Sequence, residues 1–131
     1  MVLDPLFCLR VIAQAIFDKK GSNILVLDLR KISNLTEYVI IAEGDVNKHV
    51  KALADEVVTR AERVGLHPVY LEGRRDGEWV VIDFSFITVH LFQPAWREKY
   101  ELEALWKEGE IVDVPIDTHA PAKMAGYSSV T

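Results

Sequence analysis

Histidine and cysteine are the residue types whose spacing would reveal metal binding or nucleophilic catalysis. The 131 residues contain four histidines and one cysteine. No histidine has a second histidine or a carboxylate at a ligand spacing strong enough to predict a zinc site. Cys8 lies in an apolar run without a histidine partner, which favours a packed side chain over a catalytic thiol. For His90 we expect a ring hydrogen-bonded to Asp83 or to a backbone carbonyl, with a contact to a partner molecule as the alternative.

A glycine–serine pair ahead of an acid is the second pattern with recognisable chemistry. Gly21-Ser22 precedes Asp28, as in nucleotidyltransferases, where such a turn precedes two metal-binding acids. Two-metal chemistry needs carboxylates that converge on ions about 4 Å apart. The second acid would be residue 30, but that position is Arg30, a cation where a ligand is needed. The pattern therefore argues against nucleotide transfer, and a divergent enzyme that uses Asp28 together with Asp83 is kept as an alternative.

Large aromatic side chains are dense between residues 79 and 106. They are Trp79, Phe92, Trp96, Tyr100 and Trp106. A core position explains some of them, because the last part of this stretch must cover the rest of the domain. Trp and Tyr are also enriched at the hot spots of protein interfaces. The residues alone leave two interpretations open, namely a core and a docking surface for at least two of these side chains.

The composition limits the classes of protein to which the chain can belong. Half of the residues are hydrophobic, which suits one domain with one core. The formal net charge is −5, whereas a protein that binds nucleic acid through its phosphates is normally basic, so such binding is disfavoured. No apolar run approaches the roughly 20 residues of a membrane span, and Asp4 and Pro5 do not suit a signal peptide. We expect a cytoplasmic protein that binds no membrane.

Hydrophobic periodicity and turn residues predict a single α/β (α+β) domain of order αββαββα. The predicted helices are 4–19, 46–64 and 94–106; the predicted strands are 24–28, 38–42 and 66–71, followed by a hairpin at 79–92. A short edge strand is expected at 111–116, where Pro115 limits it, and a mobile tail at 119–131. The natural architecture is a mixed sheet of roughly five strands with helices laid over it.

The hairpin at 79–92 is predicted to turn at Ser85-Phe86 and to have two different faces. Pairing Phe84 with Ile87 makes one face wholly apolar, as a face packed on a core should be. That face holds Val80, Ile82, Phe84, Ile87, Val89 and Leu91. The opposite face pairs Trp79 with Phe92, Val81 with His90, and Asp83 with Thr88. A slip by one residue would mix the two sets, so the pattern fixes the register, and the second face has the mixed character of a protein-docking surface.

Caps and loops add three local expectations. Asp45 or Asn47 is expected to cap the helix at 46–64, and Gly65 to end it in the left-handed conformation. Arg74 and Arg75 are expected at a solvated loop tip, with a contact to RNA backbone as the alternative.

Several motifs together resemble the ribosomal silencing factors, also called the Iojap family. They are Leu27-Asp28, Tyr38-Val39-Ile40, Gly44, His49-Val50, Glu72-Gly73, Trp79-Val80-Val81-Ile82-Asp83, Val89-His90, Phe92, Arg97 and Tyr100-Glu101-Leu102-Glu103-x-Leu105-Trp106. The resemblance covers roughly residues 5–106, and its most specific parts are the last motif and the hairpin. It implies a silencing-factor domain at 1–106 and a C-terminal extension at 107–131.

The resemblance implies a translation factor that is not an enzyme and uses no cofactor or metal. The family fold is similar to that of nucleotidyltransferases but lacks their catalytic acids, in agreement with Arg30. Members bind protein number fourteen of the large ribosomal subunit on the surface that faces the small subunit, and thereby keep the subunits apart. The implied partner-binding residues are Trp79, Val81, His90, Phe92, Arg97, Tyr100, Glu103 and Trp106. A minor contact with ribosomal RNA is a further expectation.

The chain departs from the family pattern at a helix start and at a turn. Val46 stands where a serine typically follows Gly44 by two residues, so the cap must come from a neighbour. Ser85-Phe86 replaces the usual Gly-Asp turn of the hairpin, which we expect to expose a phenylalanine near the contact surface. A homodimer that pairs through the same aromatic residues is the alternative to ribosome binding.

Overall fold

The structure is a computed structural model that describes residues 3–118. Its helices and strands, in order, are α1 (Pro5–Asp18), β1 (Ser22–Asp28), β2 (Tyr38–Glu43), α2 (Asn47–Arg63), β3 (Tyr70–Glu72), β4 (Trp79–Asp83), β5 (Ile87–Phe92), α3 (Pro94–Tyr100), α4 (Leu102–Leu105) and β6 (Glu110–Ile111). Across the described residues the strands form one sheet in the order β3-β4-β5-β2-β1-β6. The pair β2–β5 is parallel and the other pairs are antiparallel, so the predicted mixed α/β sheet is confirmed.

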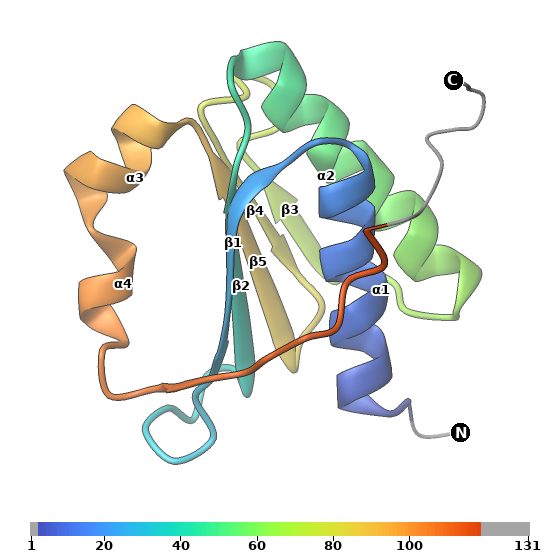
Figure 1. The fold of residues 1–131 in the computed structure, drawn as a ribbon, viewed down its shortest axis with the longest axis vertical. Coiled ribbons are helices and arrows are strands. Elements are labelled where there is room, and N and C mark those ends of the chain that lie inside the picture. Colours follow the sequence, from blue (N-terminus) through green and yellow to red (C-terminus); the bar gives the residue numbers. More distant parts are fainter. Residues whose placement is uncertain (1–2, 119–131) are drawn as a thin grey trace.

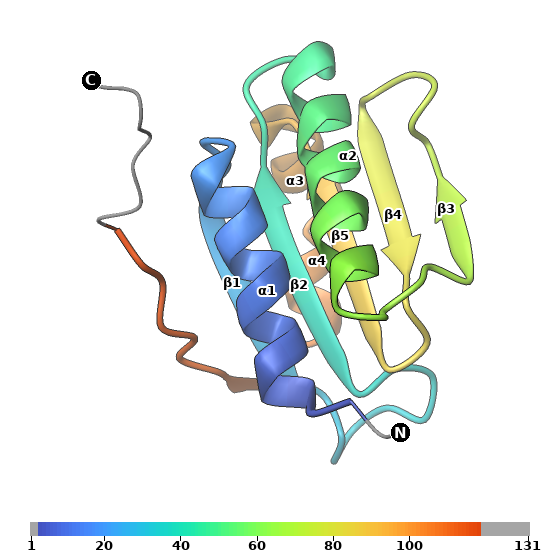
Figure 2. The same ribbon diagram turned by 90° about the vertical axis from the view of Figure 1, so that its right-hand side faces the viewer.

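The helices lie on both faces of this sheet. α1 and α2 cover one face, and α3 and α4 lie against the other (Figures 1 and 2). The larger core forms beneath α1 and α2, where Leu9 and Ile12 of α1 and Leu53 of α2 are completely buried against the strands. Cys8 belongs to this core, as expected, and burial raises the pKa of its thiol. The strand β1 is covered on both faces, because Val26 packs in this core and Leu27 packs on the opposite side.

The hairpin of β4 and β5 has the predicted register. Trp79 pairs with Phe92, Val81 with His90 and Asp83 with Thr88. All six side chains of the predicted apolar face are buried in the core beneath α1 and α2. Because side chains alternate along a strand, the same register sends the other set to the opposite face of the sheet. The turn contains Ser85 at φ 81°, whose backbone N–H donates to the Asp83 carboxylate at 2.7 Å. Phe86 packs half-buried against the main core, so the expectation that it is exposed near the aromatic residues is wrong.

The helix ends agree with the sequence prediction in part. The Asp4 carboxylate caps α1 by accepting from the Leu6 N–H at 3.2 Å, and Gly65 follows α2 at φ +84°. The expected side-chain cap of α2 is absent, because Val46 occupies the cap position without a side-chain hydrogen bond. The N–H of Asp45 instead donates to Nδ1 of His49 at 2.9 Å, which closes the first turn in another way.

Three predicted elements differ from the structure. The strand expected at 66–71 is shorter and later, because Pro68 has no N–H for the sheet and pairing to β4 is confined to Tyr70–Glu72. The helix expected at 94–106 is broken at Glu101, which adopts the left-handed conformation at φ 44°. The edge strand expected at 111–116 is instead β6 at Glu110–Ile111, which pairs with β1 and makes the sheet six-stranded within the described residues.

The segment after β6 returns across the sheet edge toward α1 (Figure 1). Val112 and Val114 pack against the main core. Gln14 of α1 bonds Asp117 twice: its Nε2 donates to the Asp117 carbonyl at 3.0 Å, and its Oε1 accepts from the Asp117 N–H at 2.7 Å. The tail predicted at 119–131 lies outside the described residues. No helix of the described part is both long and apolar enough to span a membrane.

Candidate protein-docking face

A second hydrophobic cluster lies on the face of the sheet away from α1 and α2. Its buried members are Leu27, Leu29, Val39, Ile41, Phe92 and Leu102. These residues belong to β1, β2, β5 and α4, except Leu29, which directly follows β1. The sheet and α4 therefore pack against each other through this cluster. Trp79, Trp96 and Trp106 pack against this cluster and are only partly covered. Large aromatic side chains therefore form the outer layer on this side.

We call Trp79, His90, Trp96, Tyr100 and Trp106 the aromatic face. The Trp79 ring lies 4.9 Å from that of Tyr100 and 6.0 Å from that of His90, measured between ring centroids. Trp96 stacks on Tyr100 at 5.5 Å, and His90 lies 5.6 Å from Trp106. Tyr100 remains 44% exposed. Rings from β4, β5, α3 and the end of α4 thus meet on one continuous, partly exposed surface.

The polar atoms within the aromatic face are fixed by one hydrogen bond. Nε1 of Trp79 donates to Nδ1 of His90 at 3.1 Å. An indole nitrogen can only donate, so Nδ1 must be unprotonated and the neutral ring carries its proton on Nε2. The Asp83 carboxylate, expected as the partner of His90, bonds the turn at Ser85 instead. His90 is therefore a neutral ring with a fixed tautomer and an N–H donor at Nε2.

Burial of His90 predicts that stability depends on pH. Burial disfavours the charged ring and lowers the pKa of His90 from 6.5 to about 4. The unfolded chain then binds more protons than the folded chain between these values. The contribution of His90 is therefore complete above about pH 6.5 and is lost as the pH falls toward 4, a loss on the order of 3 kcal/mol. Urea unfolding of the protein and of His90→Gln at several pH values should show a flatter pH dependence in the variant.

His67→Gln is the matched control for this measurement. The His67 side chain is 68% exposed, in the connection between α2 and β3, so this variant removes a histidine that is not buried. Equal pH slopes for the protein and His90→Gln would contradict the burial of a neutral His90.

The structure places the remaining predicted partner-binding residues in different surroundings. Val81 is half-buried next to His90 on the same face of the hairpin. Phe92 is fully buried, with its ring 5.7 Å from that of Trp79, so it lies beneath the aromatic face. Arg97 and Glu103 bond each other at 2.9 Å beside the face, and the Arg97 side chain is only 11% exposed. The exposed surface is formed by the rings of the aromatic face. Phe92 lies beneath these rings, and Arg97 lies beside them.

Sequence reasoning missed Glu43, Asn23 and Lys99. Glu43 ends β2 and is the one buried charged residue among residues 3–118. An acid at the end of an apolar strand, directly before Gly44, is the signal that could have identified it. Lys99 places its Nζ 5.1 Å from the Trp96 ring centre and 5.6 Å from that of Tyr100, which adds a cation to the rim of the aromatic face.

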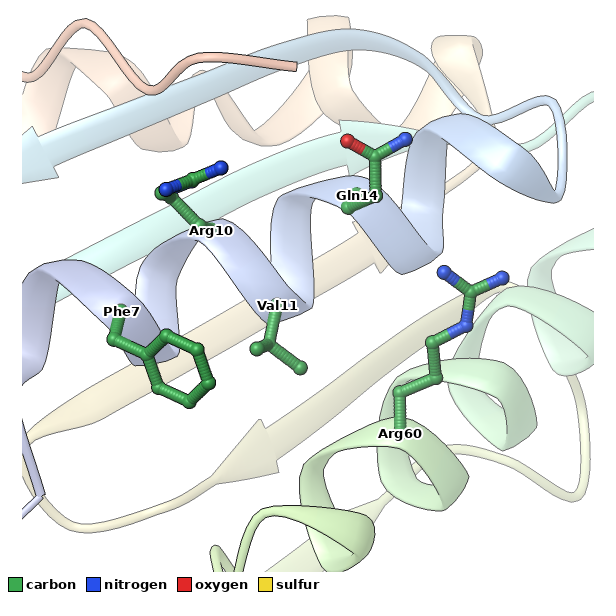
Figure 3. A pocket seen from close by; sticks show the side chains of 5 residues that line it. All are labelled: Phe7, Arg10, Val11, Gln14 and Arg60. Atoms are coloured by element: carbon green, nitrogen blue, oxygen red, sulfur yellow. The ribbon is translucent and has the colours of Figure 1, made fainter. Parts of the chain in front are cut away.

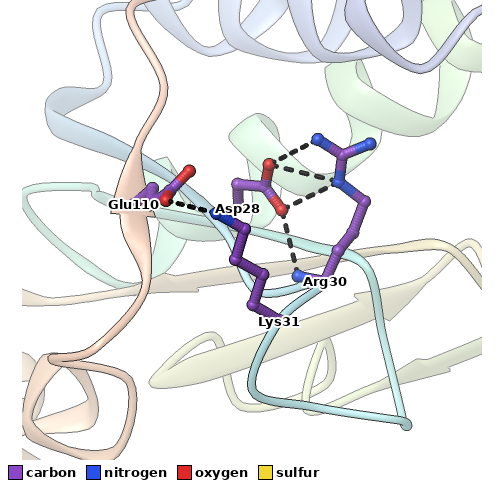
Figure 4. Close-up of polar contacts among 4 residues, drawn as sticks. All are labelled: Asp28, Arg30, Lys31 and Glu110. Carbon is purple, nitrogen blue, oxygen red and sulfur yellow. Dashed lines mark hydrogen bonds and ion pairs between the residues drawn. The ribbon is translucent and has the colours of Figure 1, made fainter.

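The site of the nucleotidyltransferase-like pattern is closed by an ion pair. Arg30 binds the Asp28 carboxylate through Nε and Nη2, with Nη2 to Oδ2 at 2.8 Å, and its N–H donates to the same carboxylate at 3.0 Å (Figure 4). Hydrogen bonding by Arg30 lowers the pKa of Asp28. Lys31 reaches across to Glu110 of β6 at 3.3 Å. Arg30 thus neutralises the Asp28 carboxylate and Lys31 that of Glu110, where an enzyme of this kind would need carboxylates free for metal.

Arginine side chains also lie on two other surfaces of the described domain. A shallow groove between α1 and α2 is lined by Phe7, Arg10, Val11, Gln14 and Arg60 (Figure 3). Arg60 is committed to Asp18 at 2.6 Å and to Glu56 at 2.7 Å. The Arg74 loop tip is likewise tied to α2, because Arg74 binds Asp55 through two bonds of 2.7 Å. Arg60 and Arg74 are therefore both held in ion pairs with acidic side chains of the domain.

The fold and the aromatic face define a small α/β protein with a partly exposed cluster of aromatic side chains on one face of its sheet. A family model described as "Ribosomal silencing factor during starvation" matches residues 5–129, and the chain belongs to this family. Membership confirms the resemblance seen in the motifs. It makes the chain a ribosome-associated regulator of subunit association. The family is named for this regulatory role and not for an enzymatic activity.

Relatives and a solved structure agree with this membership. The ribosomal silencing factor of Chromobacterium violaceum is 42% identical over 93 residues, which cover 71% of this chain and 76% of that protein. That of Bacillus subtilis is 34% identical over 106 residues, which cover 81% and 90%. A crystal structure of a Chromobacterium violaceum protein superposes with a TM-score of 0.78 at 34% identity, covering 92% of this chain and 100% of that one.

Proposed function

We propose that the chain represses translation by binding protein number fourteen of the large ribosomal subunit and thereby blocks the joining of the small subunit. The observation that carries the proposal is the aromatic face, in which rings from four elements meet and remain partly exposed. Partly exposed Trp and Tyr clusters are typical of protein hot spots. A folded domain bound on the surface between the subunits excludes the small subunit by its volume alone.

The charge of the chain favours a protein partner over RNA. The net charge is −5, and Arg74 and Arg60 are neutralised within the described domain. Docking to a protein needs no excess of cations, whereas binding to phosphates does. Ribosomal RNA is therefore a minor contact in this proposal, and the cytoplasm, where free subunits occur, is the place of action. Residues 1–106 carry the docking function, with residues 107–131 as an extension.

Subunit joining measures the proposed activity directly. Purified small and large subunits are mixed at a magnesium concentration that supports joining, with and without the protein, and separated on a density gradient. We expect fewer joined ribosomes, more free subunits, and the protein in the large-subunit fraction. The effect should be strongest when the protein is added before the subunits meet, because joined ribosomes cover the proposed surface.

Two results would contradict the proposal. The first is an unchanged fraction of joined ribosomes although the protein is in excess. The second is sedimentation of the protein with the small subunit. Sedimentation of the free protein as a pair that dissociates when large subunits are added would mean that self-association uses the same face and competes with docking.

A further inference from the structure

The segment from Pro94 to Trp106 has one buried residue, Leu102, and two partly buried rings, Trp96 and Trp106, against the sheet. We call it the 94–106 arm; it supplies three of the five rings of the aromatic face. α3 contains no buried residue, and α4 buries only Leu102. Between them, Glu101 is left-handed, which costs energy in a residue with a side chain. Burial alone therefore does not explain why the arm takes one position.

An ion network at the start of the arm supplies the missing attachment. Nη1 of Arg97 donates to the Glu43 carboxylate at 3.1 Å and to the backbone carbonyl of Asn23 at 2.6 Å. Nε of the same guanidinium donates to Glu103 at 2.9 Å. Arg97 thus connects α3 with β1, β2 and α4 through one planar group. A guanidinium suits this task because its donors have fixed directions.

Glu43 is the fixed end of this network. Its carboxylate is 11% exposed and also accepts from the Asn23 side-chain amide at 2.9 Å. β2 lies in the middle of the sheet, between β1 and β5, so the position of Glu43 is set by a strand that is paired on both sides. A buried carboxylate is unfavourable without a partner, so the arm is driven to the one position in which Arg97 reaches it.

We propose that Glu43 and Arg97 form a clamp that positions the rings of the 94–106 arm against Trp79 and His90. The proposal rests on the docking function above and deepens it. Arg97 is here a positioning residue that acts from inside the domain, not a contact to the partner as the family resemblance implies. Glu43, at the end of β2, is required for docking although it lies outside the aromatic face.

Amide hydrogen exchange tests the clamp without any ribosome. Glu43→Gln keeps the size of the side chain and removes its charge. Exchange of the arm amides, such as those of Glu101 and Ala104, should become faster by about 10-fold or more, because breaking a buried charge pair favours local opening. Exchange in β4 and β5 should stay unchanged. Equal exchange of the arm in the protein and in Glu43→Gln would overturn the clamp.

A double-mutant cycle separates a clamp from a direct contact. Affinity for large subunits is measured for Glu43→Gln, Arg97→Met and the double variant. The clamp predicts a loss of about 10-fold in each single variant and a loss in the double variant that is clearly smaller than the product of the two, because both substitutions break the same ion pair. A direct contact by Arg97 predicts a loss in Arg97→Met with full binding in Glu43→Gln, which overturns the proposal. Arg74→Met is the matched control, since its pair with Asp55 is exposed and distant from the arm.

Folding and function failures remain distinguishable in these experiments. Urea unfolding shows whether a variant still folds. If one does not, Arg97→Lys is used in its place, because lysine keeps the positive charge but lacks the fixed donor directions of the guanidinium. Arg97→Lys should show the same faster amide exchange in the 94–106 arm. If the unmodified protein does not bind large subunits, the proposed function fails while the exchange result still decides the clamp. If it binds and Glu43→Gln binds equally well, the clamp fails and the function stands.

Discussion

Replacing Trp79 by alanine should weaken binding to the large ribosomal subunit by about 100-fold, the loss of roughly 3 kcal/mol that a central aromatic hot spot can carry. Trp79 is the centre of the aromatic face, with ring contacts to Tyr100, His90 and Phe92. Its removal takes away the largest apolar surface and leaves Nδ1 of His90 without its donor. Affinity is measured by co-sedimentation with purified large subunits over a range of protein concentrations.

Controls must separate lost contact from lost fold, because Trp79 is also partly buried. Trp79→Phe keeps much of the packing and removes the indole N–H, so it should bind more weakly than the protein and better than Trp79→Ala. Phe7→Ala removes an aromatic ring that is 46% exposed on α1, across the sheet from the aromatic face, and should bind normally. Undiminished binding by a folded Trp79→Ala variant would exclude this face as the docking surface.

Replacing Phe92 by alanine should lower the free energy of unfolding by about 3–5 kcal/mol, as for other large side chains removed from a core. Phe92 is completely buried in the second cluster, between the sheet and Leu102 of α4. The cavity would lie directly beneath Trp79, so the aromatic face would lose its base. Urea unfolding monitored by tryptophan fluorescence measures the stability and reports on the same region.

Phe92→Leu decides whether Phe92 acts through the core or through the partner. Leucine restores most of the apolar volume, so this variant should lose much less stability than Phe92→Ala and should bind large subunits nearly as well as the protein. A folded, stable Phe92→Leu variant with strongly reduced binding would mean that the phenylalanine ring itself reaches the partner.

The parts of the fold that could be predicted from the sequence are those determined by local periodicity. The hairpin of β4 and β5 is the clearest case, because one register alone separates the apolar set from the mixed set. The break at Glu101 could not be predicted, since the apolar positions of 94–106 follow a continuous helical pattern. β6 could not be placed either, because pairing with β1 depends on a partner strand about eighty residues earlier in the chain.

The residue types of the candidate site could be predicted from the sequence, but the burial of each residue could not. The density of Trp and Tyr residues left a core and a docking surface open as interpretations, and the structure gathers these rings on one partly exposed face. Trp79 and Phe92 stand opposite each other in the hairpin, so the pattern assigns them the same role. Phe92 is buried in the cluster that includes Leu102 and Trp79 is only partly buried against it, a difference that arises from tertiary packing. The Arg97–Glu43 pair joins residues distant in sequence and leaves no local signal.

The parallel pairing of β2 with β5 delays the completion of the docking surface while the protein is being made. Val39 and Ile41 belong to β2, yet the cluster they join needs Phe92 and Leu102, which are synthesised much later. A nascent chain that has emerged only through α2 therefore has neither the base nor the rings of the aromatic face. Because Phe92 and Leu102 complete the cluster beneath the aromatic face, a chain that ends before them lacks the surface that we propose binds the large subunit.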